Sequence, residues 1–213
     1  IYYGGPYVRH AENAVGPGIT VSNGGTVDLF GGNITQNSDG VVVENGGTLN
    51  MPSNSEVSGN TGAGVRLEEG GTLNISGGKI GSNAGCGVDV AQGSTFNVSG
   101  GTYILSNTKN GETCNVYLHS GATMKVSELS KAKIGVTVET LPTGGNLVPV
   151  TSDGQASRSD QNCITSDNAN YRVFYSTSKS ANNLVLDARP TPLHKDHDDK
   201  SFVNSLSSSE GKL

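Results

Sequence analysis

The sequence predicts an all-β solenoid, in which short strands stack coil upon coil along one axis. Two observations carry this prediction. A motif of Gly, then Gly, Ser or Ala, then Thr and an apolar-polar-apolar triplet occurs five times in the 213 residues, at spacings of 22, 24, 23 and 28. Each copy also holds three short apolar alternations, separated by the turn-forming residues Gly, Asn and Ser. Three such strands bury their apolar faces only when coils stack.

The three strands of each coil are predicted from period-two apolar alternation, which is typical of half-buried strands. The first strand follows the Gly-Thr anchor, with inward positions Val27/Leu29, Leu49/Met51, Leu73/Ile75, Phe96/Val98 and Met124/Val126. The second strand has one apolar position per coil, at Ile34, Val57, Ile80 and Ile104. The third strand has inward positions Ile19/Val21, Val41/Val43, Val65/Leu67, Val88/Val90 and Val116/Leu118.

An asparagine recurs three residues after each apolar position of the second strand. The members are Asn37, Asn60, Asn83 and Asn107, with Asn13 as a candidate earlier member. In a stacked structure these side chains meet at one turn and can hydrogen-bond from coil to coil. Because asparagine also tolerates the left-handed backbone of tight turns, a structural ladder explains the column without a ligand.

Composition excludes several classes of protein. The net charge is −5, and the basic residues are few and scattered, which argues against nucleic acid as a partner. No stretch of about 18 apolar residues is present, so no membrane span is expected in this fragment. Glycine is abundant, with 31 residues, and tryptophan is absent, which suits a thin coil with many turns.

The three cysteines leave at least one thiol unpaired. Cys86 and Cys114 precede equivalent third strands, so stacking places their Cα atoms about 4.8 Å apart, within disulfide range. Their Cβ vectors are expected to run parallel, which is poor geometry for the bond, and we therefore expect two stacked thiols. Cys163 has no predicted partner, and no residue around the three cysteines indicates an activated nucleophile.

The chain divides into four regions. We expect an N-terminal cap over residues 1–10, solenoid repeats over 11–138, irregular β structure closing the C-terminal end over 139–188, and a linker or tail over 189–213. Within the repeats, Lys109–Glu112 is an insertion and is expected to form a solvated loop on one face. Within 139–188, Tyr171–Tyr175 and Asn183–Asp187 are predicted to pair as a hairpin.

The repeat pattern GGT-[LF]-N-[IV]-SGG-x-I-x-x-N…GV-x-[VL] resembles the right-handed parallel β-helix repeats of bacterial and archaeal adhesin-like surface proteins, including polymorphic outer-membrane-protein-type passengers. The resemblance covers about Ala11–Val138 and implies five to seven coils of three strands. It also implies a secreted or cell-surface location, and a monomeric domain of a larger chain. The same fold serves as stalk, adhesin or lyase, so the resemblance is less specific for function.

The candidate binding face lies on the third strand. Its outward column is Val42, Arg66, Asp89 and Tyr117, and a second column after the last inward residue is Glu44, Glu68, Ala91 and His119. Only here do acids, a base and an aromatic ring converge. The candidate binding residues are therefore Arg66, Asp89, Tyr117 and His119. An exposed ion pair between Arg66 and Asp89 is the simpler explanation of that pair.

Together with the family resemblance, these residues suggest a non-enzymatic surface module, an adhesin-like stalk or a β-helix that binds a glycan or protein on a host or neighbouring cell. The alternative is a polysaccharide lyase or glycoside hydrolase that acts on an acidic polysaccharide with Arg66, Glu68 and Asp89. A pure structural spacer is the second alternative. No cofactor is required, although Ca²⁺ is possible. No metal site is predicted, because His194 and His197 lie in the segment predicted to be a linker or tail without regular structure.

Overall fold

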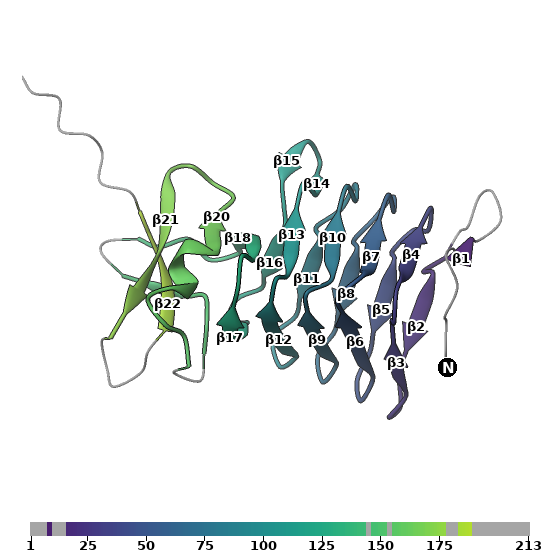
Figure 1. Cartoon of the computed structure of the whole chain (residues 1–213). Coiled ribbons are helices and arrows are strands. Elements are labelled where there is room, and N and C mark those ends of the chain that lie inside the picture. The colour runs from purple at the N-terminus through teal and green to yellow at the C-terminus, as the bar shows by residue number, and fades with distance from the viewer. Residues whose placement is uncertain (1–7, 10–15, 144–145, 153–154, 178–182, 189–213) are drawn as a thin grey trace, which may run out of the picture.

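The computed structural model is a parallel β-solenoid of about five turns, followed by a small antiparallel sheet. It describes residues 8–9, 16–143, 146–152, 155–177 and 183–188. Figure 1 shows the coils side by side in chain order along one axis, with the antiparallel sheet beyond the last coil. The predicted N-terminal cap, apart from Val8 and Arg9, and the whole predicted tail with its two histidines lie outside the described residues.

Three columns of parallel strands run along the solenoid, as the three alternations predict. The first column is β3 (Thr26–Asp28), β6 (Thr48–Pro52), β9 (Thr72–Ser76), β12 (Thr95–Gly100) and β17 (Lys125–Leu129). The second is β1 (Val8–Arg9), β4 (Gly32–Thr35), β7 (Ser55–Ser58), β10 (Lys79–Gly81) and β13 (Tyr103–Leu105). The third is β2 (Ile19–Val21), β5 (Val41–Val43), β8 (Val65–Leu67), β11 (Val88–Val90) and β16 (Val116–Leu118).

The last coil joins two of these columns in one strand. β18 (Lys133–Val138) pairs with β13 at its start and with β16 at its end, because no asparagine turn interrupts it. β20 (Ile164–Ser166) then stacks on β18. Between Asn107 and β16, the predicted insertion forms a short hairpin of β14 (Thr108–Lys109) and β15 (Glu112–Thr113).

Beyond the coils, β19 (Val148–Pro149), β22 (Asn183–Ala188) and β21 (Tyr171–Ser176) form an antiparallel sheet in that order. β21 and β22 pair as the predicted hairpin. A short 3₁₀ helix, η1 (Asp160–Asn162), precedes β20. Val150, Leu184 and Leu186 are buried in the same apolar core as the coils, so the sheet extends that core past the last turn.

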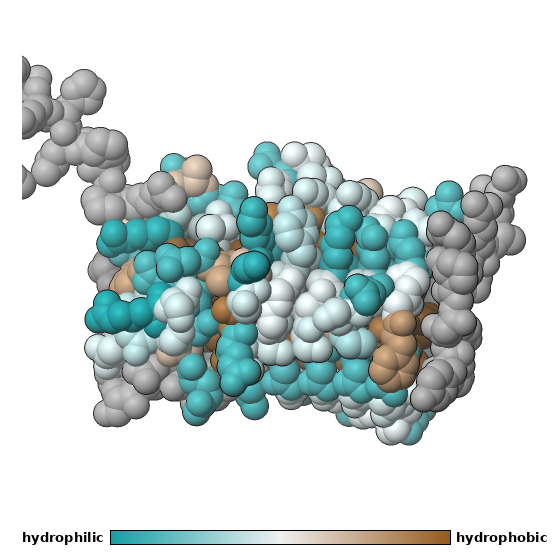
Figure 2. All heavy atoms as spheres, viewed as in Figure 1, coloured by the Kyte–Doolittle hydropathy of each residue, from teal (hydrophilic) through white to brown (hydrophobic). Residues whose placement is uncertain are grey.

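The core consists of the predicted apolar columns. Leu49, Leu73 and Phe96 stack in register in the first column, and all are at most 1% exposed. Burying one such side chain contributes roughly 1.5–3 kcal/mol, more than the roughly 0.5–1.5 kcal/mol net of a hydrogen bond. The apolar columns therefore supply most of the stability, and polar ladders contribute register. Figure 2 shows mostly hydrophilic or neutral residues on the outside of the coils.

The predicted asparagine ladder is present and buried. The Nδ2 group of each asparagine donates to Oδ1 of the next, at 3.0 Å from Asn37 to Asn60, 2.9 Å from Asn60 to Asn83 and 2.9 Å from Asn83 to Asn107. Each backbone N–H donates to the same oxygen. The candidate first member, Asn13, lies outside the described residues.

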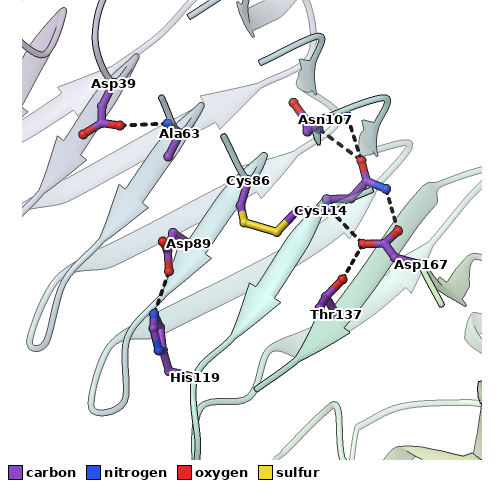
Figure 3. Close-up of a disulfide and its surroundings, with 10 residues drawn as sticks. Asp39, Ala63, Cys86, Asp89, Asn107, Cys114, His119, Thr137 and Asp167 are labelled. Atoms are coloured by element: carbon purple, nitrogen blue, oxygen red, sulfur yellow. Dashed lines mark hydrogen bonds and ion pairs between the residues drawn. A yellow bond between two sulfur atoms is a disulfide. The ribbon is translucent and has the colours of Figure 1, made fainter. Parts of the chain in front are cut away.

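The ladder continues past its predicted end. Asn107 donates to Asn115, and Asn115 donates through Nδ2 and its backbone N–H to the two carboxylate oxygens of Asp167, at 2.6 and 2.8 Å. Figure 3 shows this end of the ladder, where Thr137 also donates to Asp167. A carboxylate only accepts hydrogen bonds, so it suits the last position of a run in which every amide donates forward.

Glycine lies beside the ladder because its corner has no room for a side chain. A Cβ at Gly64 would lie 2.7 Å from Asn83 Nδ2 and 2.6 Å from Cγ2 of Ile80. A Cβ at Gly18, the equivalent glycine of an earlier coil, would lie 2.7 Å from Asn37 Nδ2. The glycine that precedes the third strand is therefore required by the asparagine of the next coil.

The two cysteines form a disulfide, so the prediction of two free thiols is wrong. Cys86 and Cys114 are bonded, with their Cα atoms 4.6 Å apart (Figure 3). Both residues lie in the turn before the third strand and not within it. Turn residues need not direct their Cβ atoms in parallel as stacked strand residues do, so the geometry allows the bond. Cys163 is free and partly buried against the core.

Candidate functional site

The candidate site lies on the outer side of the third strand column. Strand pairing places Arg66 beside Asp89, Asp89 beside Tyr117, and Tyr117 beside Thr137. The turn residues that follow these strands form a second column, since each donates its backbone N–H to the strand of the preceding coil. This column contains Glu44, Glu68, Ala91, His119 and Glu139. The register predicted from the sequence is therefore present, with one further coil.

His119 is the centre of the polar cluster on this face. Its Nε2 lies 2.8 Å from Oδ1 of Asp89 on the preceding coil, and its Nδ1 lies 3.4 Å from Oε1 of Glu139 on the following coil. Figure 3 shows Asp89 and His119 directed toward each other across neighbouring coils. The Tyr117 ring meets the His119 ring edge-on, with ring centroids 4.9 Å apart.

The insertion contributes to the same face. The ammonium group of Lys109, on β14, lies 5.3 Å from the centroid of the Tyr117 ring, in cation–π range. The loop that was predicted as a solvated insertion therefore brings a cation to the aromatic ring of the site. Its side chains are exposed, which leaves Lys109 free to exchange this contact for a ligand.

The electrostatics of the cluster follow from its hydrogen bonds. The backbone N–H of Ser120 donates to Glu139 at 2.8 Å. This bond, with smaller contributions from the Ser120 side chain and His119, lowers the pKa of Glu139. Partial burial, and then the nearby carboxylates of Glu139 and Asp89, raise the pKa of Tyr117. At neutral pH the face therefore presents an ionised carboxylate beside a neutral phenol.

Arg66 does not pair with Asp89, so the predicted ion pair between them is wrong. Its guanidinium binds Asp39 instead, at 2.9 Å. The other carboxylate oxygen of Asp39 accepts the backbone N–H of Ala63 at 2.8 Å, which holds Asp39 in place (Figure 3). Arg66 thus reaches back toward the coil that contains Val42. Val42 was predicted to face outward, but it is only 3% exposed.

The residues of the alternative catalytic set have different partners. Arg66 is engaged with Asp39, and Asp89 with His119. Within the described part of the chain, no ion pair joins Glu68 to either residue. Both ring nitrogens of His119 face carboxylates, so neither is directed at a substrate as a general base would be. Among the described residues, no cluster of three or more His, Cys, Asp or Glu side chains is arranged to hold a metal ion.

Glu139 is the site residue that the sequence reasoning missed. Its signal is the segment Gly135-Val136-Thr137-Val138, which repeats the pattern of Gly87-Val88-Asp89-Val90. This segment extends the third-strand column by one coil, and Glu139 then falls in the position of His119. The signal is easily missed because β18 lacks the asparagine turn that precedes the other third strands.

A small cavity of about 110 Å³ adjoins the cluster. It lies between the turn that follows β16 and the strand β19, where the chain leaves the coil after Glu139. Its lining includes buried apolar side chains at Leu118, Ala122 and Val138, and an exposed polar rim at Ser120 and Thr140. The hydroxyl oxygens of these two rim residues are 2.6 Å apart and share one hydrogen bond.

Comparison with protein-family models, curated proteins and solved structures gave no match. Within the described residues, no helix is long and apolar enough to cross a membrane. The adhesin-like family identity suggested by the repeat pattern therefore rests on the sequence resemblance alone.

Proposed function

We propose that this chain is a non-enzymatic binding module of a secreted or cell-surface protein, which presents the third-strand face to a glycan or to a protein on another surface. The observation that carries the proposal is the cluster of Asp89, Tyr117, His119 and Glu139. The carboxylates of Asp89 and Glu139 are hydrogen-bonded to the His119 imidazole, remain accessible, and come with it from successive coils of one column. Such a surface offers several shallow polar contacts without a positioned nucleophile or base.

Two further features support this function over catalysis. Both nitrogens of His119 face carboxylates, and in the described part of the chain no ion pair joins any two of Arg66, Glu68 and Asp89, the alternative catalytic set. The disulfide between Cys86 and Cys114 favours an oxidising environment, since disulfides persist mainly in exported proteins. That environment agrees with a secreted or surface location, and repetition along a rod suits multivalent attachment.

The test is binding of the purified chain to a broad glycan and polysaccharide array, with and without Ca²⁺. A specific hit that is lost in Asp89→Asn and His119→Ala supports the proposal. The matched control is Lys79→Ala, which removes an exposed ion pair to Glu56 on the second strand column, away from the cluster. Equal binding by all these variants would remove this face from consideration, and a blank array would favour a protein partner or a spacer.

Cleavage of a polysaccharide in the same assay would overturn the non-enzymatic proposal. The decisive variants are Asp89→Asn and Glu68→Gln, because an enzyme that uses these carboxylates would lose turnover in both. A Ca²⁺-dependent hit on an acidic polysaccharide would be the reason to perform that measurement.

A further inference from the structure

The cavity beside His119 has the size of a small substituent and not of a whole sugar ring. Its volume of about 110 Å³ is smaller than the roughly 150 Å³ of an engineered cavity that holds one benzene ring. The cavity exists because the chain departs from the solenoid after Glu139 and returns at β19, so no further coil turn among the described residues stacks on Ser120 and Gly121. In the earlier turns, Gly24, Gly46 and Gly70 each donate a backbone N–H to the glycine of the next coil.

The lining combines an apolar floor with both kinds of hydrogen-bonding group. Ala122 and Val138 are buried at the floor, and Val148 is partly buried beside them. The hydroxyls of Ser120 and Thr140 share one hydrogen bond, so one of their two O–H groups remains available as a donor. Glu139 lies beside the rim, and each oxygen of its carboxylate keeps acceptor capacity beyond the bonds from Ser120 and His119.

We propose that this cavity binds the acetamido group of an N-acetylated amino sugar. The methyl group packs on Ala122 and Val138, the carbonyl oxygen accepts the free hydroxyl of the Ser120–Thr140 pair, and the amide N–H donates to Glu139. The sugar ring then lies outside the cavity, over the face that holds His119 and Asp89. This inference rests on the proposed function, because it names the glycan class that the same face binds.

Other groups of similar size fit less well. A carboxylate would be repelled by Glu139 and Asp89. An ammonium group would be attracted by those carboxylates, but it would lose its hydration against the apolar floor. An ester lacks the N–H that Glu139 accepts, and a free hydroxyl leaves the floor unfilled. The acetamido group matches the donor, the acceptor and the apolar floor together.

The experiment compares three β-1,4-linked tetramers, of N-acetylglucosamine, glucosamine and glucose, by calorimetric titration of the whole chain. We expect at least tenfold tighter binding of the acetylated tetramer. Ala122→Leu fills the cavity and reduces that affinity at least tenfold, to the level of the glucose tetramer. Ala84→Leu makes the same change at an exposed position outside the cavity and leaves binding unaltered. If Ala122→Leu fails to fold, Thr140→Val at the exposed rim tests the same prediction.

The outcomes separate this inference from the proposed function. Equal affinities for the three tetramers, or array hits confined to sugars without an acetamido group, overturn the acetamido assignment and leave a glycan-binding face intact. An acetyl preference that survives both Ala122→Leu and Thr140→Val places the acetamido group elsewhere and overturns the assignment to this cavity. Absence of binding to every tetramer and to the whole array overturns both.

Discussion

Replacing Asn83 by alanine tests whether the buried ladder holds the coils in register. Asn83 Oδ1 accepts the side-chain and backbone donors of Asn60, at 2.9 and 3.1 Å. The substitution leaves both donors buried without that acceptor, since Asn60 is only 2% exposed. Each unsatisfied buried group costs roughly 1–3 kcal/mol. We therefore expect a loss of about 3–4 kcal/mol, a large fraction of the roughly 5–15 kcal/mol that stabilises a typical domain.

The first-strand column supplies a matched control. Asn74 donates to Asn50 and accepts from Asn97, both at 2.7 Å, in an outward ladder that ends at Asp28. These amides are partly exposed, so water replaces the lost bonds in Asn74→Ala. We expect that substitution to cost about 1 kcal/mol or less.

Both variants are compared by urea denaturation under identical conditions, followed by circular dichroism. We expect a clear gap of about 2–3 kcal/mol between these two chemically identical substitutions. Losses for Asn83→Ala and Asn74→Ala that agree within about 0.5 kcal/mol, the usual size of a neutral surface change, would refute it. That result would mean that burial does not distinguish the two ladders.

Three further predictions follow from the fold. Gly64→Ala should lower the free energy of unfolding in urea by about 1–3 kcal/mol, because its Cβ would overlap Asn83 and Ile80. Gly16→Ala is the control, since a Cβ at Gly16 has no atom within 4 Å, and equal losses in the two variants would contradict a steric cause. Reduction of the disulfide, which joins cysteines 28 residues apart, should cost about 3.5 kcal/mol, whereas a Cys86→Ala/Cys114→Ala variant should not respond to reductant. Because the pKa of Tyr117 is raised from 10.0, its contribution to stability is complete below pH 10 and is lost as pH rises through the raised value. The free energy of unfolding, measured between pH 9 and 12, should show this loss in the parent chain but not in Tyr117→Phe. The same pH dependence in both proteins would argue against this contribution.

Most of the fold could be predicted from local sequence because the solenoid repeats one short-range rule. The triplet Leu73-Asn74-Ile75 alternates inward and outward like every other copy, and a strand whose period is two leaves no choice of face. The spacing of Asn60 and Asn83 predicted their contact, since equal coil lengths place equal positions in register. The prediction stopped where the repeat stopped, at β18, and Glu139 was missed for that reason.

The partners within the candidate site were less predictable. Arg66 and Asp89 are neighbours in register, yet each binds another residue because Asp39 and His119 reach these positions from turns. The strand period does not fix the direction of turn side chains, so the sequence allowed several ion-pair partners for Arg66 and for Asp89. The cysteines differ from their prediction for the same reason.

The sequence by itself determined the strand columns, the apolar core, the asparagine ladder and the face on which polar groups gather, because each depends on a periodic pattern along the chain. Only the tertiary structure decided the disulfide, the pairing of His119 with Asp89 and Glu139, and the capping of the ladder by Asp167. It also decided the cavity beside Ser120. Each of these features depends on turn side chains, whose directions the strand period does not set, and the Asp167 cap and the cavity also depend on chain beyond the repeat.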